Sequence, residues 1–335
     1  MRDGGRLSAA IEVLGEMAAR HKPAHLALRA WGEGARYAGA KDRAFVSGLV
    51  LDVLRRRRSL AWRMGEETDR ARALAALAFD WGWAPERIAA AAEELHGPGA
   101  LTAPEFARLS SPARLEAAPA FERGWFEVQD AGSQVAALAA GEIAHRQVLD
   151  FCAGGGGKTL ALAAAMNNTG QLYAYDADAR RLAETVKRAQ RAGVRNLQVR
   201  SPIDPAALSG LENRMDLVFV DSPCTGSGTW RRHPDAKWRL TPQQLERRMA
   251  EQDAVLAAAA GYVKPGGRMV YVTCSLLAEE NEDRVAAFLA AQPSFVRAPV
   301  AIAGAEPWLT SEGYLRLTPR TAGTDGFFVA ALSRS

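Results

Sequence analysis

Hydrophobic positions recur with two different periods along this chain, and the change between them divides it. From Leu7 to Met17 apolar residues recur at spacings of three and four, which predicts a helix with one apolar face. The same spacing returns in residues 44–54, so we expect a small all-α domain over residues 1–64. Prolines and glycines interrupt residues 65–120 and predict short helices and a connector.

From residue 121 onward the pattern changes to short apolar runs that alternate with helical stretches. Each run is bounded by turn residues, as expected of buried strands. This alternation predicts an α/β domain over residues 121–335, with a parallel-rich sheet and helices on both of its faces. The strands are expected at residues 148–149, 171–175, 215–220, 268–272 and 327–332.

Composition restricts the protein class without naming a function. The 335 residues are 48% hydrophobic and 24% charged, which is typical of a globular protein that is soluble in water. The apolar runs are too short to span a membrane, and the three cysteines contain no CxxC pair. We therefore expect a cytoplasmic, monomeric protein with reduced thiols, no structural metal and no membrane segment. A net charge of +4 with clustered arginines is compatible with nucleic-acid binding and equally with a solvated helix face.

Two of the cysteines follow predicted strands directly. Cys224 lies in Asp-Ser-Pro-Cys after the run 217–220, and Cys274 lies in Thr-Cys-Ser after 269–272. A lone cysteine is most often a small buried hydrophobic residue. Here the glycine-rich loop 225–229 favours close approach to a ligand instead, and ligands of open α/β sheets bind at the carboxyl ends of the strands. Two thiols at that edge suggest covalent catalysis.

A second glycine-rich loop, residues 150–159, follows the first predicted strand. It ends in Gly-Lys-Thr, but Cys152 occupies the position where a Walker A motif needs its first glycine, and the dinucleotide pattern lacks its third glycine. Asp176 ends the second strand, where a carboxylate suits ribose hydroxyls, and Asp178 is expected to cap the next helix. A glycine loop with a ribose carboxylate and no triphosphate cradle fits S-adenosylmethionine.

With these motifs in place, the chain resembles the Sun/RsmB family of RNA cytosine-5 methyltransferases. The resemblance implies a Rossmann-like class I methyltransferase domain, and the N-terminal stretch resembles a shortened NusB-like domain. Five segments carry it: GWFEVQDAGSQ from Gly124, DFCAGGGGKT from Asp150, DLVFVDSPCTGSGTWRRHPD from Asp216, YVTCSLLAEENEDRV from Tyr271 and TDGFF from Thr324.

The resemblance implies specific roles for residues of these motifs. Cys274 is expected to be the nucleophile and Cys224 to assist product release, while Asp221 engages the cytosine ring. Lys158 is expected to lower a thiol pKa or to stabilise developing charge. The expected cofactor-binding residues are Cys152, Ala153, Gly154, Gly155, Gly156, Gly157, Lys158, Asp176, Asp204 and Asp221, and the expected RNA contacts are Arg231, Arg232, His233 and Lys237.

The chain departs from the family pattern in three places. Gly154-Gly155 replaces an Ala-Pro pair, and Ala322 replaces a frequent histidine. Arg200-Ser201 stands where a Gly-Asp pair usually contacts the adenine. Asp204 is therefore the candidate for the adenine contact. The favoured function is methylation of ribosomal RNA, with tRNA as the second choice. A non-catalytic RNA-binding or assembly factor, and a DNA or small-molecule methyltransferase, are the alternatives; neither accounts for both thiols.

Overall fold

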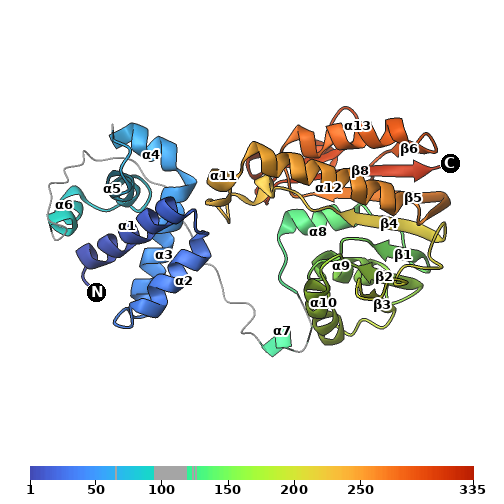
Figure 1. The fold of residues 1–335 in the computed structure, drawn as a ribbon, viewed down its shortest axis with the longest axis horizontal. Helices are drawn as coiled ribbons and strands as arrows, with labels where there is room; N and C mark the ends of the chain where they lie inside the picture. Colours follow the sequence, from blue (N-terminus) through green and yellow to red (C-terminus); the bar gives the residue numbers. More distant parts are fainter. Residues whose placement is uncertain (65, 94–118, 123, 125–126) are drawn as a thin grey trace. The chain divides into compact units, whose positions relative to one another are not determined.

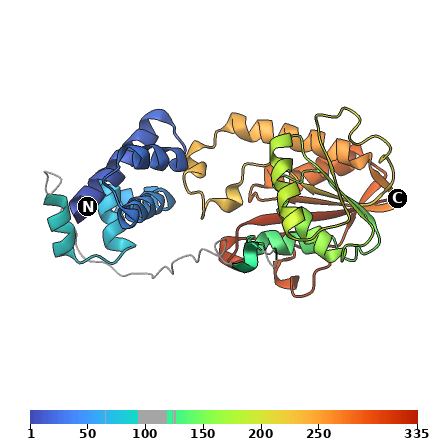
Figure 2. The ribbon, with the colours of Figure 1, turned by 90° about the horizontal axis from the view of Figure 1, so that it is seen from below.

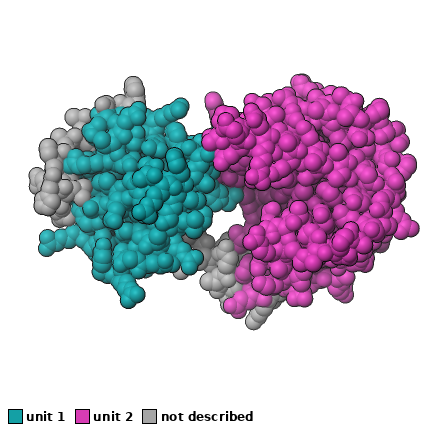
Figure 3. Space-filling model, in the orientation of Figure 1, with its two compact units in different colours: residues 1–112, 230–239 teal, residues 113–229, 240–335 magenta. Residues whose placement is uncertain are grey.

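The computed structural model describes the chain except for residues 65, 94–118, 123 and 125–126. Two compact units make up the molecule (Figure 3). One contains residues 1–112 together with 230–239, and the other contains residues 113–229 and 240–335. Within the predicted connector, residues 65 and 94–118 lie outside the described part, as do Trp125 and Phe126 of the first family motif, whereas Asp69–Phe79 and Pro85–Glu93 form short helices.

The helical unit consists of amphipathic helices around one apolar core (Figure 1). The first helix buries Leu7, Val13, Leu14 and Met17 on one side, as the spacing of its apolar residues predicts. The helices of this unit are α1 (Asp3–Arg20), α2 (Ala24–Gly34), α3 (Ala40–Arg55), α4 (Arg57–Met64), α5 (Asp69–Phe79), α6 (Pro85–Glu93) and the short α11 (Ala236–Arg239). The predicted all-α region covers residues 1–64, and the helical unit also takes in α5, α6 and residues 230–239.

The second unit is built on one mixed sheet with the order β3-β2-β1-β4-β5-β8-β6, and β7 pairs with β8. Strands β1 to β5 are parallel, whereas β8 runs antiparallel to β5, β6 and β7. This is the predicted parallel-rich sheet. The strands are β1 (Gln147–Asp150), β2 (Gln171–Tyr175), β3 (Leu197–Arg200), β4 (Met215–Asp221), β5 (Val263–Thr273), β6 (Phe295–Ala298), β7 (Leu315–Leu317) and β8 (Phe327–Arg334).

Helices cover both faces of this sheet (Figures 1 and 2). Alternate residues of β4 enter two separate cores: Leu217 and Phe219 pack with α8 and α9, and Val218 and Val220 pack with α12. The helices are α7 (Pro119–Glu122), α8 (Ala131–Leu138), α9 (Gly157–Ala165), α10 (Ala179–Arg191), α12 (Pro242–Ala260), α13 (Glu282–Ala291) and α14 (Pro319–Ala322). None of the helices in the described ranges combines the length and apolar character needed to cross a bilayer.

Local signals in the sequence fix where two of these helices begin. The side chain of Asp178 accepts from the backbone N–H of Arg180 and caps α10, as predicted. Thr241 caps α12, with Pro242 in its first turn. In contrast, β5 begins at Val263 rather than at residue 268, because its first residues pair irregularly with the start of β4 across Pro265, Gly266 and Gly267.

Candidate active site

The predicted motifs meet at the carboxyl ends of β1, β2, β4 and β5. Strands β4 and β5 are parallel neighbours, with Asp221 opposite Val272, so the loops that follow them start side by side. As a result the sulfur atoms of Cys224 and Cys274 lie 3.3 Å apart, although 50 residues separate them in the chain. Both thiols are partly buried and reduced.

The two thiols differ in how readily they ionise. The hydrogen bond from Cys224 lowers the pKa of Cys274; burial and Asp221 oppose this effect, and the Lys158 ammonium supports it. The same hydrogen bond raises the pKa of Cys224 well above its usual range, and burial and the charge of Glu280 add to the increase. Of the two thiols, Cys274 is therefore the one that ionises more readily. The thiolate is the nucleophilic form of cysteine.

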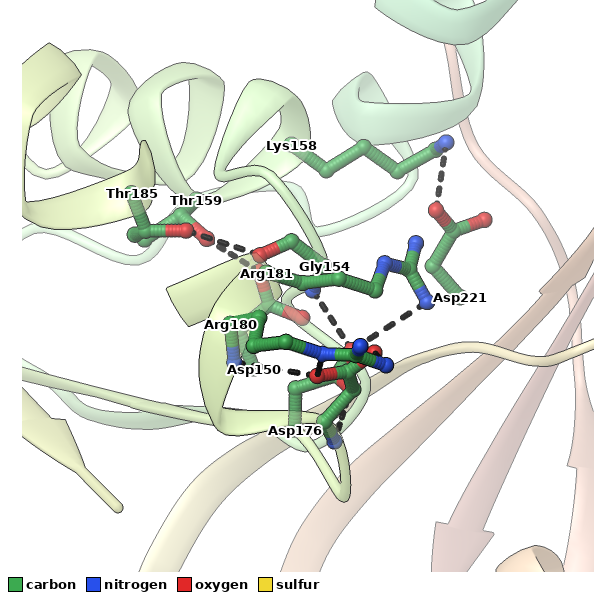
Figure 4. Close-up of polar contacts among 10 residues, drawn as sticks. Asp150, Gly154, Lys158, Thr159, Asp176, Arg180, Arg181, Thr185 and Asp221 are labelled. Atoms are coloured by element: carbon green, nitrogen blue, oxygen red, sulfur yellow. Dashed lines mark hydrogen bonds and ion pairs between the residues drawn. The ribbon is translucent and has the colours of Figure 1, made fainter. Parts of the chain in front are cut away.

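Lys158 and Asp221 form an ion pair (Figure 4), and the charges of both act on Cys274. The Lys158 ammonium donates to the Asp221 carboxylate over 2.9 Å, and it lies 5.0 Å from the centre of the Phe327 ring. The lysine is buried, whereas the side chain of Asp221 keeps 32% of its surface exposed. Asp221 is therefore open to a ligand, and Lys158 fixes its orientation.

A buried carboxylate, Glu280, connects the two cysteine loops. It accepts from the backbone N–H of Thr225 at 2.8 Å and from the side-chain amide of Gln252 at 3.0 Å. The hydroxyls of Thr225 and Ser275 donate to its other oxygen. Because Thr225 follows Cys224 and Ser275 follows Cys274, one acceptor holds both thiol-bearing loops. Glu280 does not stand out in the sequence, because the run Glu279-Glu280 looks like the solvated first turn of a helix. The available signal was that Glu280 follows the Thr-Cys-Ser motif closely in the chain.

Close backbone contacts complete the arrangement of these loops. Gly228 donates to the carbonyl of Cys274 at 2.9 Å and accepts from the N–H of Gly326 at 2.9 Å. A β-carbon on Gly228 would lie 2.3 Å from the carbonyl oxygen of Gly326, so only glycine fits there. The loop after β4 and the TDGFF segment therefore pass each other in direct contact.

The glycine loop between β1 and α9 is held by Asp176 at the end of β2 (Figure 4). One oxygen of Asp176 accepts from the N–H of Gly154 and the other from the N–H of Asp178, both at 2.8 Å. Arg181 lies 3.5 Å from the same carboxylate. Gly154 and Gly156 have φ angles of +55° and +85°, which glycine adopts without strain. A β-carbon on Gly154 would lie 2.5 Å from the Arg181 guanidinium, and one on Gly156 would lie 2.9 Å from the Thr185 side chain, so the loop packs closely against α10.

Asp150, beneath this loop, is fully buried. One oxygen accepts from the Thr159 hydroxyl at 2.7 Å, and the other has no hydrogen-bond partner among the described residues. Burial raises the pKa of Asp150 to about 7, although the hydrogen bond from Thr159 lowers it. The side chain of Cys152 packs against the core of the α12 face, and burial raises its pKa.

The remaining predicted residues lie in other places. Asp204 is exposed, in the loop after β3, and accepts from the N–H of Ala206. Arg231, Arg232 and His233 are exposed in the segment 230–239, which belongs to the helical unit although the sequence analysis included it in the methyltransferase domain. Lys237 is half-buried and donates to the carbonyl of Arg55 at 2.7 Å.

Comparison with known proteins finds relatives among curated ribosomal RNA methyltransferases. Ribosomal RNA small subunit methyltransferase B of Klebsiella pneumoniae subsp. pneumoniae is 36% identical over 230 residues, which are 68% of this chain and 51% of that protein. Its probable counterpart in Synechocystis sp. is 33% identical over 65% of this chain and 49% of its own length. The chain spans about half the length of the curated relatives that it matches.

Two solved structures share the fold of this chain. The crystal structure of PH0851 covers 100% of this chain and 99% of its own, with a TM-score of 0.71 and 21% identity. NSun6 from Pyrococcus horikoshii with SFG covers 67% of this chain and 56% of its own, with a TM-score of 0.59 and 29% identity. The family model for 16S rRNA methyltransferase RsmB/F matches residues 136–333. The chain therefore belongs to the RsmB/F family of 16S rRNA methyltransferases.

Proposed function

We propose that this protein is an S-adenosylmethionine-dependent RNA cytosine-5 methyltransferase that acts on ribosomal RNA. The observation that carries the proposal is the pair of thiols 3.3 Å apart at neighbouring strand ends, an arrangement that lowers the pKa of Cys274. A nucleophile and a second, protonated thiol within contact of one another suit a reaction that forms and later breaks a carbon–sulfur bond.

Carbon 5 of cytosine is a weak nucleophile, and the proposed chemistry activates it. The Cys274 thiolate bonds to carbon 6, and the displaced electron pair makes carbon 5 electron-rich enough to take a methyl group. Asp221 accepts from the exocyclic amine of the ring and thereby orients the base for this addition. Water then takes the carbon-5 proton, and the electron pair of that C–H bond re-forms the carbon 5–carbon 6 double bond and expels the Cys274 sulfur as a thiolate. The Cys224 thiol assists by donating a hydrogen bond to the departing sulfur.

The residues around the glycine loop fit the expected cofactor. S-adenosylmethionine would supply the methyl group as an electrophilic sulfonium. Residues 152–157 would surround it, and Asp176 would receive the ribose hydroxyls, because a carboxylate has about four acceptor positions and only two are used by backbone N–H groups. The buried Asp150 oxygen without a partner lies beneath the same loop. Asp204 is proposed to contact the adenine.

RNA is the proposed partner. Its target cytosine must leave the base stack, because only then can the base and the thiol meet. The exposed Arg231, Arg232 and His233, together with Lys237, are proposed to contact it. The printed names of the relatives favour ribosomal RNA over tRNA. We propose that the protein acts in the cytoplasm as a monomer.

Bisulfite sequencing of total RNA from cells with and without the gene tests this proposal. One ribosomal cytosine should lose its protection when the gene is deleted, and it should regain protection when the wild-type gene is restored. Restoring the gene with Cys274→Ala provides the matched control and should leave the cytosine unprotected. A pattern of protected cytosines that is the same in all strains would contradict the proposed function.

A further inference from the structure

Residues 230–239 bring positive charge to one end of helix α3. Arg55 donates to the carbonyl of Arg231 at 2.9 Å, and Lys237 donates to the carbonyl of Arg55 at 2.7 Å. The indole N–H of Trp238 donates to the carbonyl of Leu54 at 2.8 Å. The bonds from Lys237 and Trp238 satisfy two carbonyls at the C-terminus of α3, and the three bonds together fix Lys237 and Trp238 beside the α3–α4 junction.

A hollow of about 510 Å³ opens at this junction, and we call it the Trp238 pocket. Its lining combines four cationic side chains and two indoles with a serine, and it includes no aspartate or glutamate. The lining residues are Arg55, Arg56, Arg58, Ser59, Trp230, Lys237 and Trp238.

Two of the four cations have no acidic partner within the described residues. Arg55 pairs with Asp52 and Arg56 pairs with Asp80, but no carboxylate pairs with Arg58 or Lys237. Both lie against the same ring: the Lys237 ammonium is 4.6 Å and the Arg58 guanidinium 5.5 Å from the Trp238 ring. Burial, and in second place the charge of Arg58, lowers the pKa of Lys237. The two cations therefore repel one another, and an anion between them would relieve that repulsion.

A neighbouring hollow in the same unit has the opposite character. It is lined by Arg57, Arg239 and Lys22, but also by Asp69 and Asp235. There acidic side chains line the hollow together with the cations, and Arg239 pairs with Asp235 at 3.1 Å. The absence of acidic side chains is therefore a property of the Trp238 pocket and not of the helical unit in general.

We propose that the Trp238 pocket binds a backbone phosphate of RNA through Arg58 and Lys237. Guanidinium and ammonium groups are the usual protein donors to phosphate oxygens, and the Ser59 hydroxyl adds a neutral donor in the lining. RNA is favoured because the segment that carries Lys237 continues directly from the loop that carries Cys224. Thirteen residues of chain reach at most about 45 Å, so one folded RNA can contact both. This choice of ligand rests on the proposed function.

The salt dependence of RNA binding tests the pocket. The probe is fluorescein-labelled oligouridylate, and its anisotropy is measured with the full-length chain over a range of salt concentrations without a methyl donor. Each phosphate contact that is lost should reduce the slope of log K against log salt by about 0.7, so Arg58→Gln with Lys237→Gln should reduce it by about 1.4. Arg29→Gln is the matched control, because Arg29 is exposed on α2 and pairs with Glu33.

The charge-retaining double variant Arg58→Lys with Lys237→Arg separates charge from folding. It should keep most of the wild-type slope, and Arg29→Gln should keep all of it. An unchanged slope in the glutamine double variant would overturn the proposal, as would an equal reduction in Arg29→Gln or in the charge-retaining variant. Because the binding assay contains no methyl donor, it tests the pocket alone. The proposed catalytic function is tested separately, by the loss of methyl transfer in Cys274→Ala.

Discussion

Replacing Glu280 with alanine should destabilise the methyltransferase unit, because this residue is the shared acceptor of both cysteine loops. The side chain is fully buried and accepts from two nitrogen donors and two hydroxyls. In Glu280→Ala the hydroxyl of Ser275 can turn to Ser227, whose hydroxyl oxygen is 2.9 Å away. The N–H of Thr225 and the amide of Gln252 lose this acceptor.

The size of the effect follows from these two nitrogen donors. A buried donor without an acceptor costs about 1–3 kcal/mol, so the free energy of unfolding should fall by about 4 kcal/mol. For a unit of this size that corresponds to a decrease in Tm of roughly 10 °C. Glu280→Gln retains an oxygen for both nitrogen donors, and its amide can donate to the hydroxyls. It should lose no more than about 2 kcal/mol, since only the contribution of the charge to these bonds disappears.

Differential scanning calorimetry of both variants measures the stability difference, and thiol labelling measures the effect on the site. Because the charge of Glu280 raises the pKa of Cys224, Glu280→Gln should increase iodoacetamide labelling of Cys224 relative to Cys274, as read by mass spectrometry of the two peptides. A Glu280→Ala protein that melts within about 2 °C of the wild type would refute the reasoning. So would unchanged labelling in Glu280→Gln.

Three further predictions concern the site. Burial raises the pKa of Asp150 from 3.8 to about 7, so the free energy of unfolding should fall by about 4 kcal/mol as the pH rises from about 4 to about 7, and then level off. Urea titrations of Asp150→Asn should show no such decrease, and an equal decrease in the wild type and the variant would contradict the prediction. Cys224→Ala should trap an RNA–protein adduct that survives denaturing electrophoresis, whereas a protein that also carries Cys274→Ala should give none; adducts in both would exclude Cys274 as the attachment point. Asp176→Ala leaves two backbone N–H groups without an acceptor and should weaken S-adenosylmethionine binding more than tenfold in calorimetry; an unchanged Kd would remove Asp176 from the cofactor site.

Much of the fold could be predicted from hydrophobic spacing and local signals. The spacing of three and four in α1 and the apolar runs of β2 and β4 each identify one element, because its buried face repeats with the period of that structure. No strand was predicted at β6 or β7. They are short strands of four and three residues on either side of an irregular segment, and they pair with β8 only through the tertiary fold.

The order of the residues is enough to tell which chemical groups this protein has and at which edge of the sheet they lie. A cysteine that follows a parallel strand must emerge at the carboxyl edge, whichever strands are neighbours. Only the tertiary structure decided that β4 lies beside β5, which brings Cys224 and Cys274 to 3.3 Å, and that Glu280 folds inward to hold both loops. It also placed residues 230–239 with the helical unit. Strand order, burial and ionisation depend on contacts between residues far apart in the chain, and the local pattern contains no record of those contacts.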